Sequence, residues 1–464
     1  MTILDRLSTH VAEYFERHSD TPITCNVTPT EIRQHLANEY GSFDQPIPLE
    51  SVFDDVTDMM WRWAEHATNP RHFGLTRPTV DVASVVADAL VATYDPNLAT
   101  WDFCPAAQEM ERHVINLLGD RFGPGYADGL SHFTSGGEEA NRTALAVALT
   151  QHFPEVATDG LHALDKQPVL YMSAEGHHSI EKAAHSTGIG RAAVRLIPVG
   201  DNLAMDVAAL TQKIEADTAG GYVPFMLVAT AGTINAGVID PLEEMAEIAE
   251  RYKLWYHVDA AWAGAAIVSD RLRIYLSGIE RADSITCDAH KLLSVPTGAG
   301  MFFCRHRDPV ARTFGIEASY VPDAVEDGRV YPYVTSMQWS RRFMGLKMFM
   351  MFAARGLPEI ARRIEHQTEM GDYLRSRLVK EGWQLLNDTP LPVVCFTHSK
   401  IQSLKNGESA IVEEVKRMEA AWISKTTLAG GVPALRASIT NYNTTPADID
   451  VLVDGVQKAL KTIS

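Results

Sequence analysis

Residues 257–291 read HVDAAWAGAAIVSDRLRIYLSGIERADSITCDAHK and contain two apolar segments that end in polar residues. Asp259 closes the first segment, and His290 and Lys291 follow the second. A lysine amine at such a strand end can condense with a cofactor aldehyde, and a buried carboxylate can keep a pyridine nitrogen protonated. Pyridoxal 5'-phosphate (PLP) carries both an aldehyde and a pyridine nitrogen. We therefore predict that Lys291 and Asp259 bind PLP.

Two glycines form a candidate phosphate site. Gly136 and Gly137 lie in FTSGGEEANRTALAVAL, directly before a predicted helix. Backbone N–H groups at a helix start and the helix dipole attract phosphate, and glycine allows it to approach closely. Gly-Gly before a helix is also a common turn, so the motif alone is weak. Glu138 would repel a phosphate unless its side chain points away.

Two more motifs support the cofactor interpretation, since a lysine taken alone is more often a solvated surface group. SAEGHHSIEKAA follows the predicted strand PVLYM, and a histidine there can stack on a flat cofactor ring or simply cap the helix. His177 and His178 are adjacent, so only one should face the site. Small residues follow Asp259 in HVDAAWAG and leave room beneath a ring.

Composition excludes several classes of protein. A net charge of −18 over 464 residues argues against a nucleic-acid or anionic-membrane partner. The five cysteines are scattered, form no C-x-x-C pair and argue against a disulfide framework or a structural metal site. The N-terminal sequence lacks the pattern of a secretory signal, and no apolar run reaches the ~18 residues of a membrane span. We therefore expect a cytoplasmic protein without a metal cofactor.

The pattern along the chain predicts an α/β fold in three parts. Residues 1–72 read as a helical arm that must dock on another surface. In residues 73–345, short apolar runs alternate with helical patterns, which is typical of a mainly parallel sheet covered by helices. Residues 346–464 begin with a long helical stretch, continue with the strand-like PVVCFTH and ALRASI and end in a helix, which suggests a smaller α+β domain.

The motifs, in this order, resemble those of the group II PLP-dependent amino-acid decarboxylases. This family includes aromatic-amino-acid, glutamate, cysteine-sulfinate and diaminobutyrate decarboxylases, and the resemblance extends from NPRHFGLTRP to LRASITNYNTT. It implies the aspartate aminotransferase-like architecture of fold type I, with a seven-stranded sheet and a smaller C-terminal domain. It also implies a homodimer with shared active sites that acts on a small amino-acid substrate.

The resemblance assigns cofactor roles residue by residue. Lys291 matches the lysine that binds the cofactor, Asp259 the partner of the pyridine nitrogen, and His177 the histidine that stacks on the ring. Ala261 matches the small residue on the opposite ring face. Further positions where the family contacts the phosphate or lines the site are Gly136, Gly137, Thr230, Ser284 and His290. Glu138 also lies at a cofactor-binding position but departs from the pattern, because relatives often have a small residue or serine there.

The resemblance also suggests residues for the reaction and the substrate. Tyr320, in EASYVPDA, matches a tyrosine that protonates the substrate carbon after CO2 leaves. Arg341, in QWSRRFMGLK, matches an arginine that holds the substrate carboxylate in some members, although an interdomain salt bridge is equally expected. Asp102 and Phe103 lie where the family builds the substrate pocket, and His72 is expected to line it; Asp102 facing solvent and His72 in packing are the alternatives.

We therefore expect PLP-dependent decarboxylation of an L-amino acid to the amine and CO2. An oxidative decarboxylase-deaminase (aldehyde synthase), or another PLP lyase or transferase, is the nearest alternative. A catalytically silent binding protein with this fold is an alternative of another class. The sequence does not indicate which amino acid is the substrate.

Overall fold

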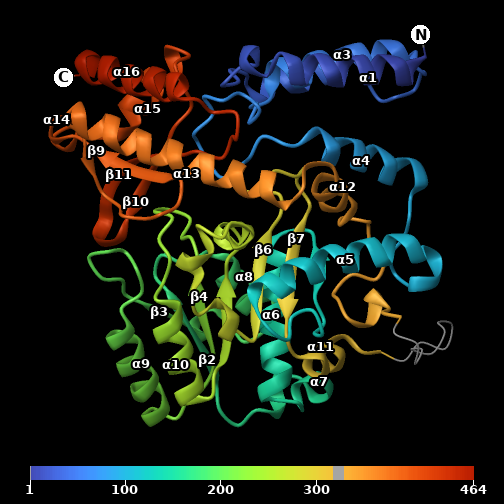
Figure 1. The fold of residues 1–464 in the computed structure, drawn as a ribbon, viewed down its shortest axis with the longest axis vertical. Helices are drawn as coiled ribbons and strands as arrows, with labels where there is room; N and C mark the ends of the chain where they lie inside the picture. Colours follow the sequence, from blue (N-terminus) through green and yellow to red (C-terminus); the bar gives the residue numbers. More distant parts are fainter. Residues whose placement is uncertain (1, 317–328, 464) are drawn as a thin grey trace.

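The computed structural model describes residues 2–316 and 329–463, and its centre is a seven-stranded sheet (Figure 1). The strand order is β1-β7-β6-β5-β4-β2-β3. Strand β7 is antiparallel to both its neighbours, and the other pairings are parallel. The strands are β1 (His132–Thr134), β2 (Pro168–Ser173), β3 (Val194–Ile197), β4 (Val223–Thr230), β5 (Trp255–Asp259), β6 (Ser284–Asp288) and β7 (Gly300–Cys304). The predicted mainly parallel α/β sheet is confirmed.

Helices cover both faces of this sheet and bury its apolar side chains. Helices α6, α8 and α11 share a core with one face, and α5, α9 and α10 share a core with the other. Their bounds are α5 (Pro105–Phe122), α6 (Gly137–His152), α8 (Ser179–Ser186), α9 (Val207–Ala219), α10 (Leu242–Tyr252) and α11 (Arg307–Phe314), with the short α7 (Val156–Asp159) after α6. Parallel strands covered on both faces read as continuous apolar runs, which is why most of them were recognisable in the sequence.

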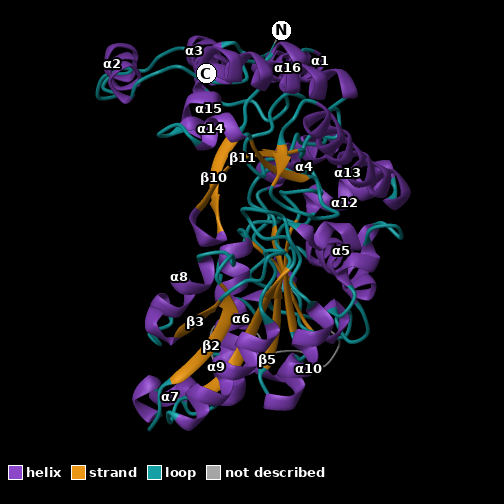
Figure 2. Cartoon of the chain, turned by 90° about the vertical axis from the view of Figure 1, so that its left-hand side faces the viewer, coloured by secondary structure: helices purple, strands orange, loops and turns teal. Residues whose placement is uncertain are grey.

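A second sheet of four antiparallel strands lies between the large sheet and the N- and C-terminal helices (Figure 2). Its strands are β8 (Gln384–Leu385), β9 (Val393–Thr397), β10 (Ser424–Leu428) and β11 (Val432–Ser438). The helices of this region are α12 (Leu346–Arg355), α13 (Leu357–Lys380), α14 (Ser399–Gln402), α15 (Gly407–Arg417) and α16 (Pro446–Ile463). The structure therefore contains the predicted smaller α+β unit.

The N-terminal helices pack differently from the rest. Helices α1 (Ile3–Glu16), α2 (Pro29–Glu39) and α3 (Leu49–Trp63) contain no buried residue, whereas α4 (Val82–Tyr94) buries three. Helix α1 lies beside α3, with an ion pair between Arg6 and Asp54. Among the described residues, none of the helices combines the length and the apolar character that a membrane crossing requires.

Candidate active site

Polar residues end four strands of the large sheet at one edge. Thr134, Thr230, Asp259 and Asp288 are the last residues of β1, β4, β5 and β6, which all run in the same direction. Ligands of open α/β sheets bind outside the carboxyl ends of the strands. This edge is therefore the expected position of the site.

The glycine turn before α6 lies against the ends of β5 and β6 and the loops that follow them. A Cβ on Gly137 would lie 2.9 Å from Oδ2 of Asp288 and 3.2 Å from Cβ of Ala261. A Cβ on Gly136 would lie 3.5 Å from Cε1 of His290. The structure thus brings the predicted phosphate turn, the small residue after Asp259 and the His-Lys pair together.

The start of α6 can accept an anion. No side chain caps this helix, and its first intrahelical backbone bond runs from Ala140 N–H to the Gly136 carbonyl. The N–H groups of the first turn thus point toward the turn and favour negative charge. Glu138, in the same turn, is exposed and accepts a 2.7 Å hydrogen bond from Lys182 Nζ on α8. Lys182 therefore offsets the negative charge of Glu138, which lies beside the predicted phosphate site.

Lys291 pairs with a carboxylate that sequence reasoning missed. Its Nζ lies 3.0 Å from Oδ2 of Asp288, which is almost fully buried. The other oxygen, Oδ1, has no hydrogen-bond partner among the described residues. His290 Nε2 lies 3.7 Å from the same Oδ2, and burial lowers the pKa of the His290 imidazole. Asp288 ends an apolar strand two residues before His290, and that position was the signal available in the sequence.

Asp259 is buried and firmly held. Its Oδ2 accepts a 2.7 Å hydrogen bond from Asn141 Nδ2 on α6, and its Oδ1 accepts a 3.1 Å bond from the Ala261 N–H. Asn141 was also missed, although it lies four residues after Gly137 and therefore on the same side of the helix. Both hydrogen bonds stabilise the ionised form of the Asp259 carboxylate, which is the form that can bind a protonated ring nitrogen.

His177 and Thr230 lie on neighbouring strand-to-loop junctions. His177 is exposed at the start of α8, and its Nδ1 accepts a 3.2 Å bond from the Ser179 N–H. Thr230 is buried at the end of β4, and its N–H donates to Oδ2 of Asp240 at 2.8 Å. A Cβ on Gly176 would lie 3.6 Å from Thr230 Oγ1, so the two loops are in contact. Stacking of His177 on a ring stays a prediction.

The residues at this edge fit PLP. A lysine amine is available for an aldehyde, and the glycine turn leaves room that a Cβ would fill. The uncapped start of α6 offers N–H groups to a phosphate, and a buried carboxylate is held in place for a ring nitrogen. Lys291, Asp259, Gly136 and Gly137 would hold the cofactor.

A family model described as "Pyridoxal-dependent decarboxylase conserved domain" matches residues 29–399, most of the chain. The chain belongs to the pyridoxal-dependent decarboxylase family. The resemblance predicted from the motifs is thereby confirmed.

Solved structures of this family's fold superpose on nearly the whole chain. Mouse CSAD in apo form is 25% identical with a TM-score of 0.88, over 98% of this chain and 99% of that one. Oryza sativa TDC with PLP and tryptamine is 22% identical with a TM-score of 0.91, over 99% and 97%. Rhodiola rosea 4-hydroxyphenylacetaldehyde synthase is also 22% identical, with a TM-score of 0.88 over 99% and 97%. The fold-type-I architecture of this decarboxylase-family chain is confirmed.

Ser284 does not belong to the phosphate site. It is the first residue of β6, whereas Asp288 and Lys291 lie at and beyond the strand's other end. Its hydroxyl bonds to Trp255 Nε1 at 2.8 Å and to His257 Nδ1 at 2.9 Å. Asp288 is four residue steps from Ser284 along β6, roughly 13 Å of extended backbone. The predicted contact is therefore corrected.

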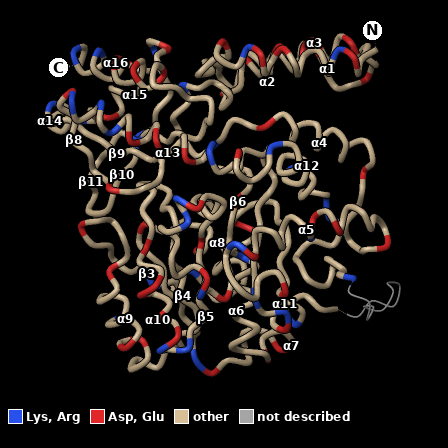
Figure 3. Tube along the Cα trace, in the orientation of Figure 1, with Lys and Arg blue, Asp and Glu red and all other residues tan. Residues whose placement is uncertain are grey.

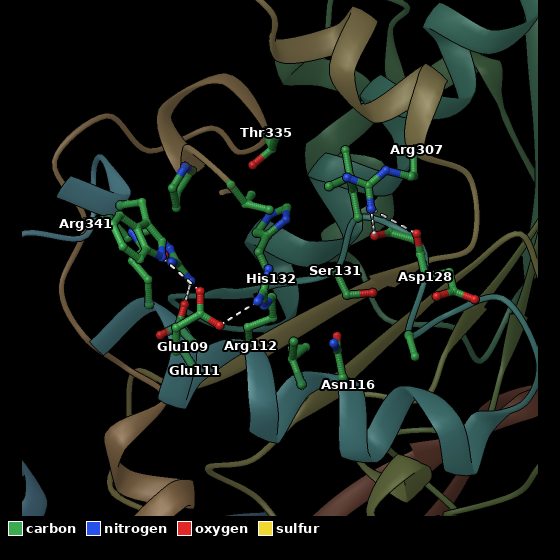
Figure 4. Close-up of a pocket in the computed structure, with 18 residues that line it drawn as sticks. Glu109, Glu111, Arg112, Asn116, Asp128, Ser131, His132, Arg307, Thr335 and Arg341 are labelled. Carbon is green, nitrogen blue, oxygen red and sulfur yellow. Dashed lines mark hydrogen bonds and ion pairs between the residues drawn. The ribbon is translucent and has the colours of Figure 1, made fainter. Parts of the chain in front are cut away.

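Arg341 lies in a different part of the decarboxylase-family fold. It lines a cavity of about 380 Å³ between α5, β1 and the segment before α12, which none of Lys291, Asp259 or His177 lines. Figure 4 shows its guanidinium beside Glu111, with which it forms a buried ion pair. Arg341 also donates to the Phe133 carbonyl at 3.0 Å. The structure shows a salt bridge, but both partners lie within residues 73–345, so it is not the interdomain bridge that was expected.

The remaining predicted substrate residues are not brought to one place. Asp102 accepts hydrogen bonds from Arg329 at 3.1 Å and Tyr331 at 2.9 Å, and Phe103 is exposed. His72 is buried and stacks on Trp422, with ring centroids 5.0 Å apart, so the packing alternative fits it. Tyr320 lies outside the described residues.

Proposed function

We propose that this chain is a PLP-dependent decarboxylase that converts an L-amino acid to its amine and CO2. One observation carries the proposal: Asp259 ends β5, Lys291 follows the adjacent β6, and their neighbours Ala261 and His290 lie against the glycine turn that begins α6. The family match and its structural neighbours support the same cofactor chemistry.

The residues would divide the work as follows. PLP, when bound, supplies an electron sink for the bond to the departing carboxylate. Lys291 would bind the cofactor and later release the product, and Asp259 would keep the ring nitrogen protonated. The first turn of α6 would hold the phosphate, and His177 would stack on the ring opposite Ala261. Thr230 would line the same space from the end of β4.

The fate of the substrate carbon separates decarboxylation from the nearest alternative. One structural neighbour is a 4-hydroxyphenylacetaldehyde synthase, so the fold alone does not choose between amine and aldehyde. We assign protonation of the carbon to Tyr320, which favours the amine. Parallel assays of amine, aldehyde and peroxide from one reaction distinguish the two activities.

The substrate is best found by screening. Asp102 is paired with Arg329 and Tyr331, Arg341 is paired with Glu111, and His72 is packed against Trp422. None of these side chains selects one substrate class. Release of CO2 from aromatic, acidic, diamino and branched aliphatic amino acids, measured with purified protein, would identify it.

We also propose that the protein works as a cytoplasmic homodimer with shared active sites. Helices α1, α2 and α3 of the N-terminal arm contain no buried residue, and they expose apolar side chains such as Leu4 and Met60. A second copy of the chain would cover them.

Replacing Lys291 with alanine tests the function directly. Without the amine, Lys291→Ala should lose the long-wavelength absorbance of lysine-bound PLP and at least 10³-fold of the CO2 release, because covalent catalysis is lost. Lys291→Arg is the matched control: it keeps a cation beside Asp288 but cannot condense with an aldehyde, and it should fail in the same way. Normal turnover by either variant would refute the assignment. PLP binding without CO2 release from any amino acid would instead favour a silent binding protein.

A further inference from the structure

A buried chain of hydrogen bonds leads from the sheet to Asp259. Trp255 Nε1 bonds to Ser284 Oγ at 2.8 Å, and Ser284 Oγ to His257 Nδ1 at 2.9 Å. His257 Nε2 lies 3.1 Å from Asn141 Oδ1, and Asn141 Nδ2 lies 2.7 Å from Asp259 Oδ2. All five residues are buried.

Chemistry fixes the direction of this chain. Asn141 Oδ1 can only accept, so the proton of a neutral His257 lies on Nε2 and points to it. His257 Nδ1 is then an acceptor, and Ser284 Oγ, which accepts from the Trp255 indole, donates its own proton to it. Thr286 Oγ1 donates to the same Oδ1 at 2.7 Å. The Asn141 amide nitrogen is left to donate to Asp259.

The reverse arrangement is excluded by the carboxylate. Turning the Asn141 amide around would place its oxygen 2.7 Å from Asp259 Oδ2, where two acceptors repel each other. It would also remove the Asn141 amide N–H from which Ser179 Oγ accepts a hydrogen bond at 2.8 Å. Burial lowers the pKa of His257 to about 4, so the imidazole is neutral at pH 7.

The same helix holds both ends of the candidate site. Gly137 begins α6 at the phosphate turn, and Asn141 lies one turn further along. A helix turn rises about 5.4 Å and is rigid when its face is packed. On β5, His257 and Asp259 are two residues apart and therefore share the face that α6 covers.

We propose that Asn141 and His257 are positioning residues for the cofactor ring. Resting on the function proposed above, the chain from Trp255 through Ser284, His257 and Asn141 holds Asp259 as an acceptor at a fixed distance from the phosphate turn. Ser284, which the sequence assigned to the phosphate, acts at the far end of this chain. The residues orient a carboxylate and transfer no proton.

Substitution of Asn141 measures how much the hydrogen-bond chain contributes to PLP binding. Asn141→Asp keeps the shape and the acceptor toward His257 but replaces the donor with a carboxylate oxygen facing Asp259. We expect at least tenfold weaker PLP binding, measured by fluorescence titration, and an altered spectrum of bound PLP. Ser179→Ala removes the other hydrogen bond of the same amide and is the matched control, expected to keep PLP affinity within about threefold. Equal losses in both variants, or no loss in either, would overturn the proposal.

The His257 tautomer gives a readout that needs no cofactor. Nitrogen-15 spectra of histidine-labelled protein, with and without PLP, should show His257 neutral with its proton on Nε2, the signal being assigned by its absence in His257→Gln. A proton on Nδ1, or a charged ring at pH 7, would overturn the proposal even if Asn141→Asp fails to fold. If wild-type protein does not bind PLP, the proposed function fails, whereas the tautomer still tests the hydrogen-bond chain separately.

Discussion

At the scale of a single residue, Arg341 shows how strongly one buried charge affects stability. Its guanidinium and the Glu111 carboxylate are both buried, and Glu111 Oε2 also accepts the Gly345 N–H at 3.0 Å. Burying either charge alone is costly, so each depends on the other. The pair joins α5 to the segment before α12, which explains an arginine here without any substrate.

Removing Arg341 should therefore unfold the protein more easily. We expect Arg341→Met to lower the free energy of unfolding by about 3–5 kcal/mol, because Glu111 keeps a buried, unpaired charge. Urea unfolding measures the change. The neighbouring Arg342→Met is the control: Arg342 is half exposed and lies 3.4 Å from Asp88, so a loss below about 1 kcal/mol is expected. Unchanged stability of Arg341→Met with a raised KM would instead support substrate binding.

The candidate cofactor residues at the strand ends could be predicted, but their hydrogen-bond and ion-pair partners could not. Lys291, Asp259 and the glycine turn have recognisable spacings along the chain. Asn141 and Asp288 reach the site from a helix and a strand whose packing the sequence does not state. Ser284 was misplaced because a motif gives only the order of residues along the chain. Which end of β6 a residue occupies depends on where the strand begins, and the motif does not state that.

At the scale of elements, the connection after β4 positions one wall of the site. Asp240 is buried there, and its carboxylate accepts the N–H groups of Thr230 at 2.8 Å and Met205 at 2.9 Å. Burial raises the pKa of Asp240 from 3.8 to about 6. Between these values the folded protein binds more protons than the unfolded chain, so this carboxyl lowers stability as pH rises.

Asp240→Asn should reveal this dependence. The amide offers one acceptor oxygen where two N–H groups need one each, so the variant should be less stable than wild type at pH 5, by about 1–3 kcal/mol. By pH 8 the deficit should shrink by about 1 kcal/mol, because only the wild-type protein then buries a charge. Urea unfolding of both proteins at the two pH values provides the test. A deficit that is constant with pH would contradict the assignment.

The elements that the sequence pattern missed are those with weak local signals. Strand β1 has only three residues, and the edge strand β10, SKTTL, is polar at every position but the last. The long helical stretch after residue 345 is two helices, because Gly356 has φ +73° and Pro358 follows in the first turn of α13. Buried parallel strands such as β4 and β5 were found because both their faces are apolar.

At the scale of the whole molecule, the charge and the N-terminal arm bear on assembly. Acidic and basic residues are interspersed along the chain (Figure 3), although the net charge is −18. Such a charge opposes self-association unless apolar surface is buried in return. Leu4 is 72% exposed and Met60 61% exposed, on α1 and α3. The arm supplies apolar surface of this kind.

The arm should hold two chains together. We expect the double substitution Leu4→Glu and Met60→Glu to shift the protein from dimer to monomer at micromolar concentration, because each change places a charge in an apolar contact that stable interfaces need. Sedimentation velocity measures the species present. Ser8→Glu with Ser51→Glu adds the same charge at exposed polar positions of the same helices and should leave the dimer intact.

If wild type is already a monomer, or if both double variants dissociate equally, the arm does not act through these apolar residues. Loss of CO2 release in step with dissociation, restored at higher protein concentration, would in turn support active sites shared between the two chains.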